Sequence, residues 1–229
     1  MKRGCLGCGG LVAVVLVIGL AWQMLTWPDV GRLATENPPT TSFIARYQRQ
    51  ERAAGRSGTV EWQWVPASRI SSNLRRAVIV AEDGNFYRHH GFDMAEIRKS
   101  IAEAKEEHEF PRGASTITQQ LAKNLWLSPS RNPLRKVKEV LLTRALERRL
   151  GKARILELYL NVVEFGPGVY GAEAASRHYF GHGADGLSAR EAMQLAASLP
   201  KPSLWHPGSG SRTYQRRVER LLKRMERSG

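Results

Sequence analysis

The stretch that decides the fold reads Ala77-Val-Ile-Val-Ala-Glu82-Asp83-Gly-Asn-Phe86-Tyr-Arg-His89-His90-Gly91-Phe-Asp93. Its apolar beginning predicts the buried end of a helix over residues 73–83. Two adjacent carboxylates at such a place are costly unless they are paired, and burial raises the pKa of a carboxyl group. The pair Glu82 and Asp83 therefore suits a general base. The alternative is a capping turn in which both acids face solvent.

A second polar stretch, residues 112–124, reads Arg-Gly-Ala-Ser-Thr-Ile-Thr-Gln-Gln-Leu-Ala-Lys-Asn. Thr116 and Gln119 have the spacing of a capping box, which predicts that a helix begins here. The N–H groups of a helix start, with the Ser115 hydroxyl, the Gln120 amide and the Lys123 ammonium, describe an anion site. The alternative is a well-capped amphipathic helix with no ligand.

A third stretch, residues 131–154, holds nine Lys or Arg against two Glu, a net charge of +7. Lys136, Glu139 and Thr143 recur at i, i+3 and i+7, so they share one face of the predicted helix. A cationic face of this density can hold a diphosphate, whereas a solvated face more often mixes the two signs. The alternative is an ordinary surface helix.

Most of the remaining chain also has helical patterning. Helices are predicted over 94–107, 115–126, 133–150, 153–161, 171–180, 189–198 and 213–227. Residues 57–66 alternate apolar and polar, which indicates one short strand or a loop with packed Trp. Residues 166–171 are predicted to form a tight Gly/Pro turn. Because no series of strands follows, the predicted fold class is mainly α.

Composition bounds the class of protein. The 229 residues are 42% hydrophobic, which allows one sizeable domain or one domain with an appendage. Six Trp, six Tyr and six Phe argue against disorder. Only Cys5 and Cys8 are present, which excludes a disulfide scaffold and argues against a cysteine metal site. The net charge of +14 points to a phosphate-bearing partner.

The N-terminus predicts a membrane anchor. Lys2 and Arg3 precede an uncharged, largely apolar stretch over 4–27, and about 20 apolar residues span a bilayer. A cleaved signal peptide is the alternative, but no small-x-small cleavage sequence follows Ala21. We predict an anchor over 1–27 with a cytoplasmic N-terminus, a polar linker over 28–56, and a domain over 57–229 outside the inner membrane.

Four ordered motifs then resemble those of one family, the peptidoglycan glycosyltransferases, which are the lysozyme-like transferase domains of class A penicillin-binding proteins. The resemblance covers residues 60–205 and is closest to the monofunctional members, because no transpeptidase domain follows. Ala114 stands where the family has a second Gly. The motifs are Glu82-Asp-x-x-Phe86-x-x-His89-x-Gly91, Gly113-x-Ser115-Thr-Ile-Thr-Gln-Gln120, Arg135-Lys136-x-x-Glu139 and Lys152-x-x-Ile155-Leu-Glu157-x-Tyr-Leu-Asn161.

The resemblance implies a fold, a reaction and partners. The fold is a two-lobed, lysozyme-like helical domain whose smaller jaw lobe, over residues 94–111, dips into the membrane; its many charges here argue against deep insertion. The reaction polymerises lipid II into glycan with inversion and releases undecaprenyl diphosphate. Moenomycin is the expected inhibitor. Expected partners are lipid II, the nascent glycan strand and membrane lipids, while divisome or elongasome proteins and other penicillin-binding proteins are left open.

The resemblance also implies roles for residues. Glu82 is the expected base, and Glu139 matches the family's second catalytic acid, acting at the diphosphate directly or through a bound cation. No cofactor is obligatory and no protein metal site is expected, with Mg²⁺ or Mn²⁺ near the diphosphate as an open alternative. The expected substrate-binding residues are Asp83, Ser115, Gln120, Lys123, Arg131 and Lys136.

Three rival functions fit less well. Ser198-Leu-Pro-Lys201 matches the Ser-x-x-Lys of a transpeptidase, but Pro200 breaks the required helix and no Lys-Thr-Gly follows. A lytic lysozyme-like enzyme would share the fold and the catalytic Glu, yet it has no need for the cationic helix. A nucleic-acid-binding module would explain the charge but not the predicted anchor.

Overall fold

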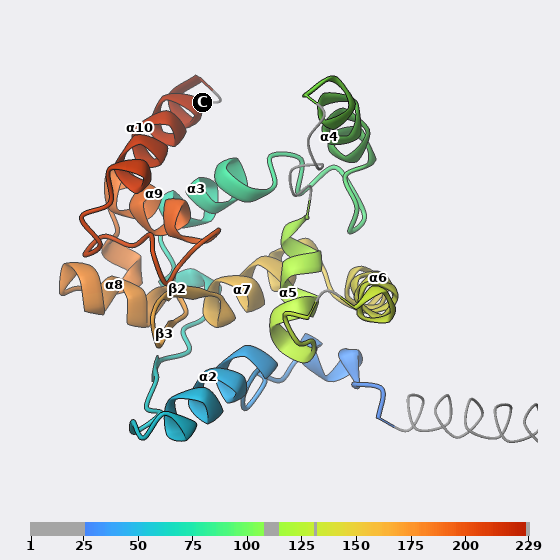
Figure 1. The fold of residues 1–229 in the computed structure, drawn as a ribbon, viewed down its shortest axis with the longest axis horizontal. Helices are drawn as coiled ribbons and strands as arrows, with labels where there is room; N and C mark the ends of the chain where they lie inside the picture. Colours follow the sequence, from blue (N-terminus) through green and yellow to red (C-terminus); the bar gives the residue numbers. More distant parts are fainter. Residues whose placement is uncertain (1–25, 108–114, 131, 228–229) are drawn as a thin grey trace, which may run out of the picture.

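Helices make up most of the chain that the computed structural model describes, residues 26–107, 115–130 and 132–227 (Figure 1). This confirms the mainly α class. The elements in chain order are η1 (Val30–Ala34), α2 (Ser42–Ala53), β1 (Glu61–Trp62), η2 (Ala67–Arg69), α3 (Ser72–Glu82), α4 (Met94–Glu107), α5 (Ile117–Trp126), α6 (Pro133–Arg149), α7 (Lys152–Val162), β2 (Glu164–Gly166), β3 (Val169–Tyr170), α8 (Ala172–Phe180), η3 (Ala184–Gly186), α9 (Ala189–Ser198) and α10 (Arg212–Arg227).

Side-chain caps fix the helix starts that matter for the polar stretches. Ser71 caps α3 through the N–H of Asn73, and Asp93 accepts the N–H groups of Ala95 and Glu96. The predicted capping box at α5 is confirmed, because the Thr116 hydroxyl and the Gln119 amide satisfy each other's backbone N–H. Each cap satisfies a donor that the first helical turn leaves without a partner.

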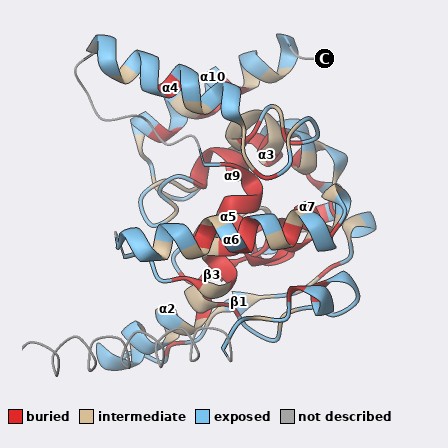
Figure 2. Cartoon of the chain, turned by 90° about the vertical axis from the view of Figure 1, so that its right-hand side faces the viewer, coloured by how far each residue is buried: buried red, intermediate tan, exposed pale blue. Residues whose placement is uncertain are grey.

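Two helix groups share one apolar core. α3 packs against α9 and α10, while α5 packs against α6 and α7. Figure 2 shows the buried residues running through α9, α5 and α7 in the middle of the molecule. Phe86, Tyr159 and Phe165 are among its largest fully buried side chains. Ala77 and Val78 of α3 belong to this core, and Glu82 and Asp83 follow them at the end of the helix.

A small sheet lies beside this core in the order β1-β3-β2. β1 is parallel to β3, with Glu61 opposite Val169, and β2 is antiparallel to β3. The predicted strand in 57–66 is thus β1. The predicted Gly/Pro turn is confirmed at residues 167–168, where it joins β2 to β3. Gly171 follows at φ +81°, where a Cβ would lie 2.6 Å from the Asn161 carbonyl oxygen.

Residues 28–56 differ from the predicted linker. This stretch carries η1, which packs on α6, and α2, which packs on α5. Val30, Leu33 and Ile44 are buried. The Arg154 guanidinium also donates to the carbonyl oxygens of Leu33 and Glu36. The polar composition predicted a linker, because the stretch contains few apolar residues, and the three that are buried are enough to hold it on the domain.

The C-terminal helix packs on the domain. Tyr214, Val218 and Leu221 of α10 are buried against it. None of the helices in the described residues is long and apolar enough to cross a bilayer. The predicted anchor over 1–27 falls on residues 1–25, which lie outside the described residues.

We expect Gly91→Ala to lower the free energy of unfolding by about 1–3 kcal/mol, since a non-glycine residue at positive φ is strained. Gly91 has φ +90°, and a Cβ would lie 2.8 Å from Cγ2 of Thr143. Denaturant unfolding in detergent measures the loss. The matched control is Gly208→Ala, an exposed glycine whose Cβ would meet His206 only at 3.5 Å. Equal stability of the two variants would contradict the prediction.

Candidate active site

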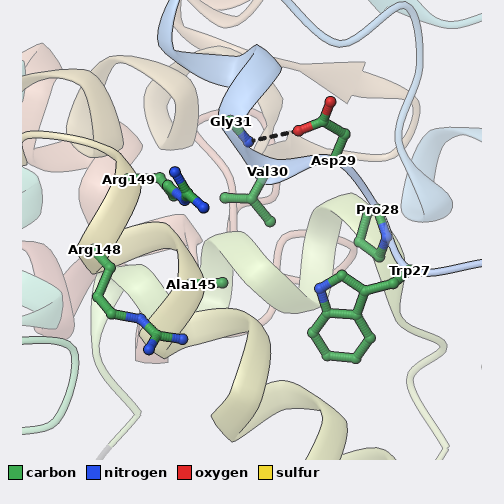
Figure 3. Close-up of a pocket in the computed structure, with 8 residues that line it drawn as sticks. All are labelled: Trp27, Pro28, Asp29, Val30, Gly31, Ala145, Arg148 and Arg149. Atoms are coloured by element: carbon green, nitrogen blue, oxygen red, sulfur yellow. Dashed lines mark hydrogen bonds between the residues drawn. The ribbon is translucent and has the colours of Figure 1, made fainter. Parts of the chain in front are cut away.

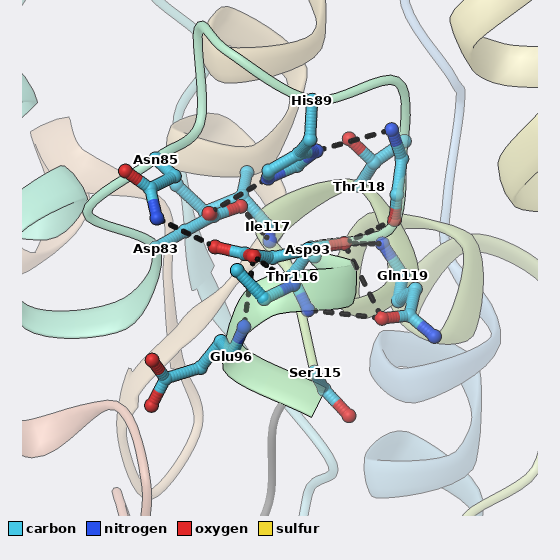
Figure 4. A network of polar contacts seen from close by, with 12 residues as sticks. Asp83, Asn85, His89, Asp93, Glu96, Ser115, Thr116, Ile117, Thr118 and Gln119 are labelled. Atoms are coloured by element: carbon cyan, nitrogen blue, oxygen red, sulfur yellow. Dashed lines mark hydrogen bonds and ion pairs between the residues drawn. The ribbon is translucent and has the colours of Figure 1, made fainter. Parts of the chain in front are cut away.

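The carboxylate of Asp83 joins the end of α3 to the start of α5 (Figure 4). Its Oδ2 accepts the N–H of Ile117 at 3.0 Å, and its Oδ1 accepts from Nε2 of His89 at 2.8 Å. Nδ1 of His89 accepts the Gly91 N–H at 3.1 Å, so Nε2 carries the proton. Asp83 is almost fully buried and both of its oxygens are engaged. This geometry makes Asp83 a support of the site, and its predicted contact with substrate stays a prediction.

Glu82 precedes Asp83 and contacts side chains of α5 and α10. Its Oε2 accepts from Nε2 of Gln120 at 2.9 Å, and its Oε1 accepts from Nη2 of Arg217 at 3.2 Å. Burial raises the pKa of the Glu82 carboxyl, while the Gln120 hydrogen bond and the charges of Arg217 and Lys123 lower it. A buried carboxylate with a raised pKa is suited to accept a proton near neutral pH.

Gln120 holds Glu82 in place. While its amide nitrogen donates to Glu82, its Oε1 accepts from the hydroxyl of the buried Tyr159 at 2.9 Å. Tyr159 thus fixes which end of the amide faces the carboxylate. Gln120 was predicted to bind substrate. The structure shows that its oxygen accepts from Tyr159 and that its amide nitrogen donates to Glu82 and, at 3.4 Å, to the carbonyl oxygen of Ser115.

A cluster of charges lies on the neighbouring faces of α5 and α6. Glu139 is buried and forms ion pairs with Arg135, at 2.7 Å, and with Lys136. Lys123 of α5 is mostly buried, and burial lowers the pKa of its ammonium, while Glu139 and Glu82 act to raise it. The charge of Lys123 is therefore felt by both predicted catalytic carboxylates, with no direct ion pair to either among the described contacts. The spacing of Lys136 and Glu139 on one helix face is confirmed.

A cavity of about 310 Å³ opens at Glu82. Glu82, Asp83, Ser115 and Arg224 line it, together with residues from the loop before α4. Ser115 is exposed at its edge, so the structure brings this predicted residue to the base. Arg131 was also expected here, but it lies outside the described residues.

A larger cavity of about 700 Å³ lies elsewhere, between the start of the described chain and α6 (Figure 3). Its walls include Trp27, Arg148 and Arg149, and its single carboxylate, Asp29, is largely exposed. It contains no buried base, so we assign the chemistry to the smaller cavity at Glu82. Among the described residues, no group of three His, Cys, Asp or Glu could hold a metal ion.

Sequence reasoning missed Arg217 and Tyr159 as parts of this site. Arg217 lies in the helix predicted over 213–227, and its guanidinium reaches Glu82 from 135 positions away. The apolar residue Val218 beside Arg217 is a sequence signal that this part of α10 faces the domain, and Val218 is indeed buried. Tyr159 stands in the fourth motif, for which the sequence predicted no site residue.

Comparison with known proteins shows the family. A family model described as transglycosylase matches residues 50–226. This chain belongs to the transglycosylase family. It is 45% identical to the biosynthetic peptidoglycan transglycosylase of Thiobacillus denitrificans, over 96% of this chain and 93% of the relative. The corresponding proteins of Herminiimonas arsenicoxydans and Janthinobacterium sp. are 41% and 40% identical, each over 94% of this chain and 93% of the relative.

The transglycosylase is therefore an enzyme, a peptidoglycan glycosyltransferase of cell-wall synthesis. This outcome confirms the resemblance drawn from the four motifs. It also confirms the preference for a transferase over the three rival functions.

We expect Asp83→Ala to destabilise the transglycosylase by about 2–6 kcal/mol, because two donors, on Ile117 and His89, lose their acceptor at about 1–3 kcal/mol each. Thermal or denaturant unfolding measures the effect. The matched control is Asp185→Ala, which breaks a half-exposed pair with Arg69 that is worth at most about 1 kcal/mol. Similar losses in both variants would show that Asp83 does not support the fold.

Proposed function

We propose that this transglycosylase polymerises lipid II. It transfers the growing glycan from undecaprenyl diphosphate to the 4-hydroxyl of the lipid II GlcNAc, with inversion, and releases undecaprenyl diphosphate. The observation that carries the proposal is a buried carboxylate, Glu82, at a cavity, together with Lys123, whose charge interacts both with Glu82 and with the Arg135–Lys136–Glu139 cluster on α6. A base and a cationic cluster are what displacement of a diphosphate by a sugar hydroxyl requires.

Glu82 takes the proton in this mechanism. As the acceptor oxygen attacks the anomeric carbon of the donor, its proton passes to the Glu82 carboxylate and the bond from that carbon to the diphosphate breaks. Burial raises the pKa of Glu82, which makes it a stronger base than a solvated glutamate. The hydrogen bonds from Gln120 and Arg217 hold the carboxylate in one orientation. A held orientation lowers the entropy cost of reaching the reactive geometry.

The cationic cluster stabilises the leaving group. Diphosphate departs as an anion, so it needs positive charge and no proton donor. Lys123 and Lys136 supply that charge, and Glu139 fixes Lys136 and Arg135 by ion pairs. Glu139 thus acts by positioning cations, and both of its oxygens already have partners. No step of the mechanism uses a metal ion, and Mg²⁺ or Mn²⁺ at the diphosphate stays a prediction, as does the role of Arg131.

The location of the enzyme follows from its lipid-linked substrate. We propose a single-pass protein of the inner membrane, with residues 1–27 as anchor, a cytoplasmic N-terminus and a periplasmic catalytic domain. The two-lobed, lysozyme-like arrangement with α4 in a membrane-proximal jaw belongs to the same proposal, as do inhibition by moenomycin and any divisome or elongasome partner. Its support is the apolar stretch 4–27 and the family to which the chain belongs.

We expect Glu82→Gln to lower kcat for glycan polymerisation by about 10²–10⁴-fold, the range that a general base contributes. The amide keeps the size of the side chain but cannot take the proton. The assay incubates the detergent-solubilised full chain with labelled lipid II and resolves the glycan products. KM and the unfolding temperature are expected to stay near the wild-type values. Polymerisation at a near wild-type rate would refute Glu82 as the base.

We expect Arg217→Gln to move the acidic limb of the kcat/KM–pH profile to higher pH. Activity falls as the pH drops through the pKa of the base, and the Arg217 charge lowers the pKa of Glu82. Removing that charge leaves the pKa higher, so Glu82 becomes protonated at a higher pH. The matched control is Arg216→Gln, an exposed neighbour with no side-chain contact to Glu82. An unmoved limb in Arg217→Gln would contradict the assignment.

A further inference from the structure

The outward side of α10 carries a continuous row of positive charges. With about 3.6 residues per helical turn, most of the basic residues of this helix fall within roughly a third of its circumference. They are all exposed, and we call them the α10 cationic face: Arg212, Arg216, Arg220, Lys223, Arg224 and Arg227. The two acidic residues of the helix lie outside this face. One of them, Glu219, forms an ion pair with Arg190 of α9 at 2.6 Å.

The opposite side of α10 is used for packing. Tyr214, Val218 and Leu221 are buried against the domain, and α10 contributes none of the exposed large apolar side chains of the described residues. Figure 1 shows α10 beside α9 and α3, away from α6. The helix therefore offers a partner its charge, and no exposed apolar stripe with which to enter a bilayer.

Ion pairs do not neutralise this face. Within the described residues, Arg212, Arg216 and Arg220 form no ion pair, and the guanidinium of Arg220 donates only to the carbonyl oxygen of Arg216, at 3.4 Å. An open hollow of about 780 Å³ lies along the first turns of α10, and the same three arginines line it. Like charges at i and i+4 destabilise a helix, so an anionic partner in this hollow would be stabilising.

The α10 cationic face leads to the base. Arg224 lines the 310 Å³ cavity at Glu82, and a Cβ on Gly84 would lie 3.4 Å from its Nη2. At a rise of about 1.5 Å per residue, Arg212 is about 18 Å along the helix axis from Arg224. The face therefore extends outward from the catalytic cavity, on the helix that also supplies Arg217 to Glu82.

We propose that the α10 cationic face binds the nascent glycan strand through the carboxylates of its peptides. Each disaccharide of lipid II bears a short peptide, and a peptide ends in a carboxylate, so the polymer carries negative charge at regular intervals. Guanidinium groups bind carboxylates through charge-assisted, often bidentate hydrogen bonds. A second copy of the chain fits less well, because a self-complementary contact would bring two cationic faces together.

The inference rests on the proposed function and adds a site that retains the product. The growing strand is the donor in every cycle, so it has to stay near Glu82 after each transfer. Several weak ion pairs along one polymer keep its reacting end at a high effective concentration in the cavity. Loss of the α10 cationic face is therefore expected to shorten the glycan strands that the enzyme makes.

The test measures binding of lipid-free glycan strands that bear peptides to the detergent-solubilised full chain. Replacing Arg212, Arg216 and Arg220 together by Gln is expected to raise Kd by about tenfold, the equivalent of about 1.4 kcal/mol, which is a reasonable sum for three exposed ion pairs. Replacing all three by Lys is expected to restore most of the affinity. The unfolding temperature is expected to stay near the wild-type value, because all three side chains are exposed.

The matched control removes three charges from another helix. Arg46, Arg49 and Arg52 are exposed residues of α2, and their replacement by Gln gives the same change in net charge. We expect this variant to bind strands as the wild type does. Strands from which the peptides have been removed are expected to bind the wild type and the α10 variant equally.

Three results would overturn the inference. The first is equal binding of strands with and without peptides, and the second is equal weakening by the α10 and α2 replacements. The third is unchanged strand binding in an α10 variant that has lost binding to phosphatidylglycerol in the micelles, which would assign the face to lipid phosphate. Because binding needs no turnover, its failure is distinct from a failure to polymerise lipid II.

Discussion

The carboxylate of Asp83 is the contact on which the rest of the site depends. It accepts the first N–H of α5 and the imidazole N–H of His89, and so joins the end of α3, the following loop and the start of α5. Without an acceptor, these buried donors would cost free energy, so the three segments have one favourable arrangement. Because Glu82 is the neighbouring residue, the same contact fixes where the base emerges.

Charge balance at the site follows from burial. Glu82 is largely removed from water, which raises the pKa of its carboxyl, and Arg217 limits that rise from α10. Glu139 is buried as well, but its two cationic partners lie on its own helix. One carboxylate is thus kept basic while the other serves to hold cations, and Lys123 lies within the influence of both. This division suits a proton transfer at one end of the reacting bond and an anionic leaving group at the other.

The two sides of helix α6 lie in different environments. Glu139, Leu142 and Thr143 are buried against the domain, while Leu134 and Val137 face outward. The basic side chains that give the net charge of +14 therefore have several different roles. Some lie in the cationic cluster, Arg148 and Arg149 line the outward cavity, and Arg217 serves the base. The net charge of the chain cannot separate these roles, because it carries no information on where each charged side chain lies in the fold.

Local chemistry determined much of this protein from its sequence alone. Apolar periodicity and caps such as the Thr116–Gln119 box depend on neighbours within one helical turn, so the helices and the spacing of Lys136 and Glu139 were predictable. Only the tertiary structure decided that Arg217 reaches Glu82, that Asp83 supports the fold, and that residues 28–56 pack on the domain. These contacts join residues far apart in the chain, and their formation depends on how whole helices pack, which no short sequence pattern records.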